Sequence, residues 1–178
     1  MASRISKKLI RITLIITVLA LAGVALSCDS SLLSQEAPDF TLPTMTGANI
    51  NLSELEGTSV VLNFWATTCP ACVGELSFFE AVAQESEGEI KVIAINVGQS
   101  LSRVQTFFDD YEPTMIVALD GNTEVFQTYS QHDNPRWYIP ITFFIDSEGI
   151  VQYIKIGAFQ SKTELWDTLN DVLGITIP

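Results

Sequence analysis

Cysteine and histidine, the residues that build most metal and disulfide sites, are scarce in this chain of 178 residues. It has three cysteines and one histidine, and it contains neither a second CxxC pair nor an HxxxH motif. Because a structural zinc ion usually takes four Cys or His ligands, zinc binding is disfavoured. The same count argues against a framework of several disulfides.

Positive charge is also scarce once the first 27 residues are set aside. The remainder carries 21 acidic residues and five basic ones, which gives a formal charge of −16. The basic residues are Lys91, Arg103, Arg136, Lys155 and Lys162. This balance argues against nucleic acid as a partner and against charge-driven docking on anionic lipid. An acidic, solvated surface is enough to explain it.

The first 27 residues have the opposite character. Four basic residues, from Arg4 to Arg11, precede an uncharged run of 15 residues from Ile12 to Leu26. This order is typical of a secretory signal, whose apolar core spans about 7–15 residues. An uncleaved membrane anchor, which needs about 20 apolar residues, is the second interpretation. We therefore expect the rest of the chain to be extracytoplasmic.

Cys28 follows this run directly, in the sequence Ala25-Leu26-Ser27-Cys28. The tetrapeptide resembles the lipobox of bacterial lipoproteins, although Ala25 stands where leucine is usual. The resemblance implies that Cys28 carries a lipid anchor; the alternative is an ordinary cysteine beside a signal or anchor helix. We predict a signal peptide or membrane anchor over 1–27, a linker over 28–37 and one domain over 38–178. That domain would be attached to the outer face of the cytoplasmic membrane or released into a periplasm.

The rest of the chain alternates short apolar runs with segments of helical periodicity. Ser59–Ala66 is a near-continuous apolar run, typical of a strand buried on both faces. We predict strands at 39–42, 49–52, 59–66, 91–97, 115–119, 141–146 and 150–156, and helices at 69–85, 101–111, 122–129 and 161–173. A capping box from Ser161 to Glu164 opens the last helix. This order predicts an α/β fold with a central mixed, mostly parallel sheet flanked by helices, and an N-terminal β-hairpin extension.

The chemistry of the chain centres on Cys69-Pro70-Ala71-Cys72, which follows a predicted buried strand and opens a helix. A thiol at a helix N-terminus lies near unpaired backbone N–H groups and the positive end of the helix dipole, so its thiolate is favoured. Pro70 suits the first helical turn, where its missing N–H would have no partner. Cys69 is therefore the expected nucleophile, and the more buried Cys72 the resolving thiol of a disulfide exchange. Half of a metal site and an inert structural disulfide are the alternatives.

Two stretches carry a family resemblance. Residues 37–72, APDFTLPTMTGANINLSELEGTSVVLNFWATTCPAC, and residues 138–146, YIPITFFID, resemble the TlpA/ResA/CcmG-like thioredoxin family. The resemblance covers about residues 36–174. It implies a thioredoxin-like fold and a thiol–disulfide oxidoreductase with no cofactor beyond its own Cys69–Cys72 disulfide.

The resemblance also implies partners. The common role in this family is to reduce disulfides of exported proteins for cytochrome c maturation, with apocytochrome c as substrate and a membrane thiol carrier as electron donor. A disulfide-forming dithiol oxidase uses the same residues, and the reduction potential of the pair decides between the two directions of electron flow.

Several residues take site roles from the resemblance. Pro140 corresponds to a cis-proline that faces the CxxC pair, and Ile139 before it holds the substrate chain. Glu75 corresponds to an acidic residue that tunes the thiols and relays a proton. The alternatives are a strand-initial trans-proline at Pro140 and a solvated helix residue at Glu75. Asn63 replaces the buried aspartate of ordinary thioredoxins, which makes another acid such as Glu75 more necessary.

The remaining site predictions concern the substrate side. Trp65 is either an apolar platform beneath the site or a core residue. Thr68 stands where the family often has tryptophan, next to the exposed side of Pro70 and Ala71. We expect these four residues to contact the substrate.

An insertion of about five residues, His132–Arg136, precedes Pro140. Arg136, Trp137 and Tyr138 are either partner contacts or a neutral surface, and His132 is interpreted as a surface residue. Two other activities are disfavoured by the sequence. A peroxiredoxin needs Pro and Ser/Thr where Leu62 and Ala66 stand, and a copper-delivery module needs CxxxC with a suitably placed histidine.

Overall fold

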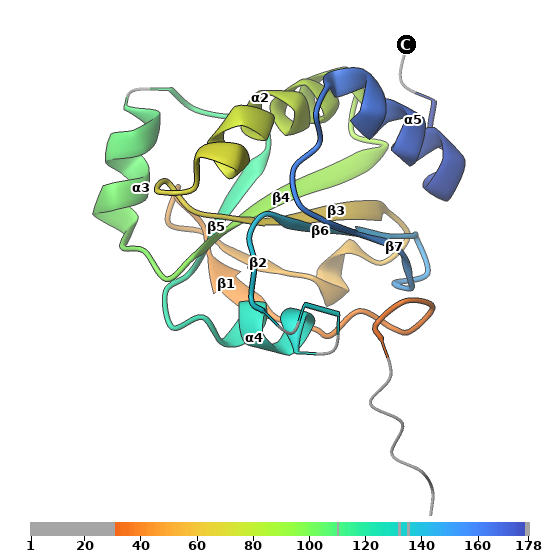
Figure 1. Cartoon of the computed structure of the whole chain (residues 1–178), viewed down its shortest axis with the longest axis horizontal. Coiled ribbons are helices and arrows are strands. Elements are labelled where there is room, and N and C mark those ends of the chain that lie inside the picture. Colours follow the sequence, from red (N-terminus) through yellow and green to blue (C-terminus); the bar gives the residue numbers. More distant parts are fainter. Residues whose placement is uncertain (1–30, 110, 132, 135, 177–178) are drawn as a thin grey trace, which may run out of the picture. The chain divides into compact units, whose positions relative to one another are not determined.

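The computed structural model describes residues 31–109, 111–131, 133–134 and 136–176 (Figure 1). Its elements, in chain order, are β1 (Thr41–Pro43), β2 (Asn49–Asn51), the 3-10 helix η1 (Ser53–Leu55), β3 (Ser59–Trp65), α2 (Pro70–Glu85), β4 (Ile90–Val97), α3 (Leu101–Phe108), β5 (Ile116–Asp120), α4 (Glu124–Ser130), β6 (Ile141–Ile145), β7 (Val151–Ile156) and α5 (Lys162–Leu173). The signal segment 1–27, Cys28 and His132 lie outside the described residues. In the part that the structure describes, no helix is long and apolar enough to cross a membrane.

A five-stranded sheet forms the centre of the domain, in the order β5-β4-β3-β6-β7. The β5/β4 and β4/β3 pairs are parallel, whereas β6 is antiparallel to both of its neighbours, β3 and β7. Four strands therefore point one way and β6 points the other, which confirms the predicted mixed sheet. In β3 every residue after Ser59 is buried, as expected for a central strand covered on both faces.

Alternate residues of β3 feed two separate apolar clusters, one on each face of the sheet. Val61 and Trp65 pack with residues of α2, α3 and α5. Leu62 and Phe64 pack with residues of α4 and of the N-terminal segment. Figure 1 shows α2 and α5 above the sheet and α4 below it. The thioredoxin-like α/β architecture predicted from the sequence is thus confirmed.

The predicted N-terminal hairpin is present as β1 and β2, paired antiparallel with Thr41 opposite Asn51. It is attached to the main sheet by a bridge between Thr44 and Ala118 and by a hydrogen bond from Met45 N to Val117 O of 2.8 Å. The extension therefore rests on the β5 edge of the sheet.

Residues 34–37, which the sequence assigns to a linker, pair with the start of β7. Ser34 N donates to Val151 O at 2.7 Å, and Ala37 N donates to Gly149 O at 2.9 Å. Because these backbone groups are bonded to the sheet, the folded domain begins before Pro38.

Two local expectations differ from the structure. The second predicted helix, 101–111, ends at Phe108, because Asp109 adopts φ 53° and turns the chain out of the helix. The capping box of α5 is half formed. Ser161 accepts a hydrogen bond from Glu164 N at 3.1 Å, but the Glu164 side chain bonds to Gln160 N and Lys155 instead of returning to Ser161 N.

Candidate active site

The two cysteines of the CxxC motif sit at the junction of β3 and α2. Cys69 is the N-cap of α2, and its Sγ accepts a hydrogen bond from Cys72 N at 3.2 Å. The two sulfurs are joined in a disulfide, with the Cα atoms 5.3 Å apart. Cys69 is half-buried, whereas Cys72 is 0% exposed. Only one of the two sulfurs is thus open to a partner, which is the geometry expected of a nucleophile and a resolving thiol.

The helix that begins at this pair favours a thiolate at Cys69. Pro70 occupies the first helical position, and the first turn of α2 contains no acidic residue. The unpaired N–H groups of that turn and the helix dipole therefore favour a thiolate on Cys69 in the reduced protein. Their effect is to lower the pKa of a thiol at this position.

Ile139 and Pro140 lie directly beside the pair, although they are far away in the sequence. The Ile139–Pro140 peptide bond is cis, as the family resemblance implies. The carbonyl oxygen of Ile139 lies 3.7 Å from Cys69 Sγ. Ile139 is half-buried and Pro140 is buried, so the backbone before the proline lines the accessible side of Cys69.

Glu75 lies one helical turn beyond Cys72 and is only 1% exposed, which excludes the solvated alternative. Its Oε1 accepts a hydrogen bond from Asn63 Nδ2 at 3.0 Å, and its Oε2 accepts one from Phe159 N at 2.7 Å. Burial raises the pKa of Glu75 to about 7, although both hydrogen bonds and the charge of Lys155 oppose that rise. This carboxyl group therefore changes its charge near neutral pH.

Asn63, which stands where the resemblance places the buried aspartate of ordinary thioredoxins, links Glu75 to the sheet. Its Nδ2 also donates to Thr142 Oγ1 at 3.0 Å, and Thr142 stands directly opposite Asn63 on β6. Asn63 and Thr142 are both 0% exposed. A neutral donor thus contacts the carboxylate where a second acid would have repelled it.

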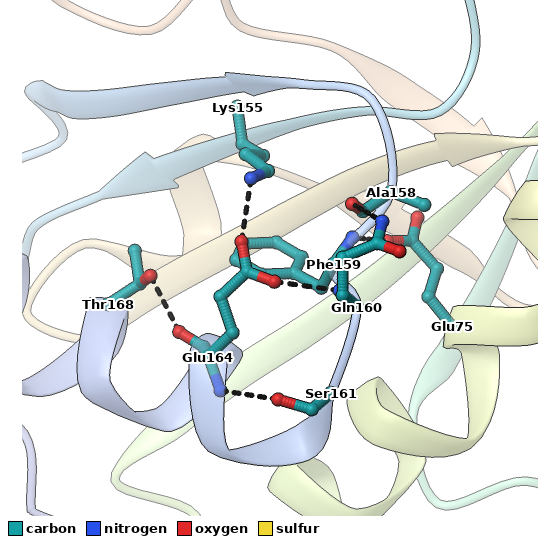
Figure 2. Close-up of polar contacts among 8 residues, drawn as sticks. All are labelled: Glu75, Lys155, Ala158, Phe159, Gln160, Ser161, Glu164 and Thr168. Atoms are coloured by element: carbon teal, nitrogen blue, oxygen red, sulfur yellow. Dashed lines mark hydrogen bonds and ion pairs between the residues drawn. The ribbon is translucent and has the colours of Figure 1, made fainter.

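A second set of polar groups converges on the segment between β7 and α5 (Figure 2). Phe159 N donates to Glu75, while Gln160 N donates to Glu164 Oε2 at 2.7 Å. Glu164 Oε1 forms an ion pair with Lys155 Nζ, also at 2.7 Å. Sequence reasoning missed this cluster. The available signal was Lys155 itself, a charged residue inside an otherwise uncharged strand.

Thr67, two residues before Cys69, is held by a clamp that sequence reasoning also missed. Gln99 Oε1 accepts a hydrogen bond from Thr67 N at 2.8 Å, and Gln99 Nε2 donates to Thr67 Oγ1 at 3.0 Å. Asn96 Nδ2 orients Gln99 at 3.0 Å, and Arg103 Nε donates to Thr67 Oγ1 at 3.2 Å. These bonds fix the turn that presents Cys69.

The predicted substrate contacts separate into two groups. Thr68, Pro70 and Ala71 are exposed beside Cys69, so they are open to a partner. Trp65 is 0% exposed and packs against Phe107, with the ring centres 5.2 Å apart. Direct contact between Trp65 and a substrate is therefore corrected to core packing in the cluster that also contains Cys72.

Residues 136–138, just before Ile139, are exposed, and the side chain of the buried Asn134 holds them in place. Asn134 is buried, donates from Nδ2 to Tyr138 O at 2.6 Å and accepts from Tyr138 N at 3.0 Å. Arg136, Trp137 and Tyr138 are exposed. Among the described residues, no group of three His, Cys, Asp or Glu side chains is arranged to hold a metal ion.

Comparisons with known proteins give relatives of one kind. The sequence profile named Redoxin matches residues 33–172. The thiol–disulfide oxidoreductase ResA of Bacillus cereus is 31% identical over 141 residues, which cover 79% of this chain and 78% of ResA. The solved structure assigned as thiol:disulfide interchange protein DsbE of Chlorobium tepidum gives a TM-score of 0.70 at 26% identity, over 82% of this chain and 100% of that one. The exposed lipoprotein thioredoxin Etrx1 of Streptococcus pneumoniae gives 0.64 at 25% identity, over 75% and 99%.

Proposed function

The chain belongs to the Redoxin family and is a thiol–disulfide oxidoreductase of the ResA and DsbE type, and from this premise we propose that it reduces disulfides of exported proteins. The observation that carries the proposal is the position of Cys69. Its half-exposed sulfur stands at a helix N-terminus and 3.7 Å from the Ile139 carbonyl oxygen. A protein disulfide that approaches along Ile139 meets Cys69 first.

The reaction proceeds in two exchanges. The Cys69 thiolate attacks one sulfur of the substrate disulfide, which forms a mixed disulfide and expels the other substrate sulfur as a thiolate. The Cys72 thiolate then attacks Cys69 Sγ, closes the Cys69–Cys72 disulfide and expels the second substrate thiolate. The two expelled thiolates take up protons, so the substrate gains two electrons and the protein dithiol loses them.

Glu75 serves the second exchange. Cys72 is buried and must lose its proton before it attacks, and Glu75 is a buried carboxylate one turn away on the same helix. With a pKa of about 7, Glu75 accepts that proton at neutral pH and releases it later.

The exposed residues around Cys69 form the surface that contacts the substrate. The backbone at Ile139 holds the substrate chain in an extended form, as an added strand-like segment. Thr68, Pro70 and Ala71 contact the residues that flank the substrate disulfide. Because these three side chains are small, the surface offers little discrimination by itself, and the exposed Arg136, Trp137 and Tyr138 extend it.

We assign the protein to the outer face of the cytoplasmic membrane. The basic start and 15-residue apolar run support export, and the lipobox-like sequence supports a lipid on Cys28. The relative from Streptococcus pneumoniae is itself described as an exposed lipoprotein. The family resemblance of residues 37–72 and 138–146 implies apocytochrome c as substrate and a membrane thiol carrier as electron donor, and we include both in the proposal.

The reduction potential of the Cys69–Cys72 couple tests the proposed direction. The full-length protein is equilibrated with thiol/disulfide buffers, and the oxidised fraction is counted by mass spectrometry after alkylation. A value near that of thioredoxin, about −270 mV, supports a reductant, and a value near that of DsbA, about −120 mV, establishes the oxidase instead. A pair that does not titrate at any attainable potential is an inert disulfide and overturns both.

A further inference from the structure

A row of polar residues crosses three neighbouring strands, β3, β6 and β7. Asn63 on β3 stands opposite Thr142 on β6, and Thr142 stands opposite Lys155 on β7. Residues directly opposite one another in neighbouring strands project from the same face of a sheet. The row therefore starts at the hydrogen-bond partner of Glu75 and ends at a lysine.

Lys155 reaches back toward Glu75 over the segment that joins β7 to α5. Its Nζ lies 5.2 Å from the centre of the Phe159 ring, and the backbone N–H of Phe159 donates to Glu75. Glu164 contacts the same segment through Gln160 N and forms an ion pair with Lys155. Figure 2 shows Lys155, Glu164 and Glu75 around this one turn of chain.

We propose that Lys155 and Glu164 are positioning residues for the redox reaction, which act together to set how readily Glu75 takes up and releases a proton. The inference rests on the proposed role of Glu75. It assigns a role in the redox reaction to Lys155 and Glu164, which act through Glu75 and not through direct contact with either cysteine.

The charges that face Glu75 act in opposite directions. Burial is the largest influence and raises the pKa of Glu75, while the hydrogen bonds from Phe159 N and Asn63 lower it. The charge of Lys155 also lowers this pKa, and the charge of Glu164 raises it. On its own helix, the titratable group one turn before Glu75 is Cys72. Because the Lys155–Glu164 pair is neutral as a whole, removal of one member exposes the effect of the other.

The partial burial of this pair makes its influence larger than that of a surface pair. The side chains of Lys155 and Glu164 are 25% and 35% exposed, so water and salt screen them incompletely. A second ion pair, Lys162–Glu85 at 3.0 Å, joins α5 to α2 but is 41% and 38% exposed. Neither of its members is among the groups that shift the pKa of Glu75, so this pair is the matched control.

The test compares full-length wild type with Lys155→Met, Glu164→Gln, Lys162→Met and Glu75→Gln. In the oxidised protein, the Glu75 carboxyl signal is followed by carbon-13 NMR against pH. Lys155→Met should raise the apparent pKa of Glu75 by about half a pH unit, and Glu164→Gln should lower it by a similar amount. Glu164→Gln keeps an oxygen that can accept from Gln160 N, so this variant preserves the turn. Lys162→Met should leave the titration unchanged.

The second readout is the reduction potential between pH 5 and pH 9. The bend in the plot of reduction potential against pH should move to higher pH in Lys155→Met and to lower pH in Glu164→Gln. Lys155→Arg should restore the wild-type profile. A shift in the same direction for both variants, or none, overturns the inference, since a merely structural role predicts that both act alike. If Glu75→Gln leaves the profile as in wild type, the proposed role of Glu75 fails as well. If Glu75→Gln changes the profile but Lys155→Met and Glu164→Gln do not, the inference alone fails.

Discussion

The sulfur of Cys69 and the carbonyl oxygen of Ile139 lie 3.7 Å apart, although 70 residues separate them in the sequence. The contact brings the start of α2 and the start of β6 to the same end of the sheet. Since Ile139 is half-buried and Cys72 has no exposed surface, a substrate segment beside Ile139 reaches Cys69 and cannot reach Cys72 without a change in the fold.

This asymmetry predicts different behaviour of the two cysteine variants. Cys72→Ser should accumulate a mixed disulfide between Cys69 and its substrate, because the first exchange proceeds and the second has no thiol to complete it. Cys69→Ser should accumulate none, because the remaining thiol is buried. The measurement is mass spectrometry of the reduced variant after incubation with a model disulfide peptide. Comparable adduct on Cys72 in the Cys69→Ser variant would reverse the assignment of nucleophile and resolving thiol.

Glu75 predicts a stability that depends on pH. Its pKa in the folded protein is about 7, against an ordinary value of 4.5. A raised pKa means that the stabilising contribution is present below pH 4.5 and is lost as the pH rises through 7. Glu75→Gln cannot ionise, so its free energy of unfolding relative to wild type should rise by about 3 kcal/mol between pH 4 and pH 8.

Urea unfolding of the oxidised wild type and Glu75→Gln at several pH values measures this difference. The substitution also changes the bonds to Asn63 and Phe159, but that cost is present at every pH and cancels in the comparison. Glu85→Gln, a half-buried position of the same helix, is the control and should show no comparable trend. A difference between Glu75→Gln and wild type that does not vary with pH would show that Glu75 keeps its ordinary pKa.

Glu80 predicts the opposite pH dependence. Its carboxylate accepts hydrogen bonds from Thr114 N at 2.8 Å, Met115 N at 3.1 Å and the Tyr111 hydroxyl at 2.8 Å. Burial acts to raise the pKa of Glu80, but these bonds outweigh it and the pKa is lowered. The stability that they provide is therefore present above pH 4.5 and is lost as the pH falls through the lower folded value.

At pH 7, Glu80→Gln should lower the free energy of unfolding by about 1–3 kcal/mol, because bonds to a charged acceptor are replaced by weaker ones. The loss should shrink when thermal unfolding is repeated near pH 3. Glu85→Gln removes only a single, partly exposed ion pair with Lys162 and should cost less than about 1 kcal/mol at either pH. An equal loss for both variants at pH 7 would contradict the anchoring role of Glu80.

The parts of the site that were predicted from sequence depend on local pattern. The apolar run from Ser59 to Ala66 and the helical spacing after Cys72 are sufficient to place the CxxC pair between a buried strand and a helix. The proximity of Glu75 to Cys72 follows from helix geometry alone. The cis peptide before Pro140 was expected from the family resemblance, since the sequence by itself does not distinguish the two isomers.

The parts that were missed depend on contacts between distant segments. Lys155 is adjacent to Thr142 only through the register of β6 and β7, and Phe159 reaches Glu75 across 84 residues. Glu164 matched a capping box, but its carboxylate bonds to Lys155 and Gln160, because a strand end lies close enough to compete for it. Local pattern gives no register between strands, so the charge of Lys155 stands out in the sequence of its strand but its partners do not.

Gln99 predicts that the turn before Cys69 is held from a neighbouring loop. Gln99→Ala removes both bonds to Thr67 and leaves the Thr67 N–H without its acceptor. Exchange of the Thr67 amide hydrogen should become at least about fivefold faster, since the loss of one hydrogen bond to a partly buried group is worth about 1 kcal/mol or more. The rate of disulfide reduction should fall several-fold, because Cys69 is then presented less uniformly beside Ile139.

Hydrogen exchange followed by NMR and stopped-flow reduction of a disulfide peptide measure these two effects. Gln127→Ala is the matched control, because Gln127 also donates to a threonine hydroxyl, Thr123 Oγ1 at 2.8 Å, but lies on α4 at the other face of the sheet. It should leave both rates unchanged. Fast exchange at Thr67 with an unaltered reduction rate would mean that the clamp stabilises the turn without orienting Cys69. If the Thr67 amide hydrogen of Gln99→Ala exchanges as slowly as in wild type, Gln99 is not needed to hold the turn. The bond from Arg103 to Thr67 Oγ1 is then sufficient.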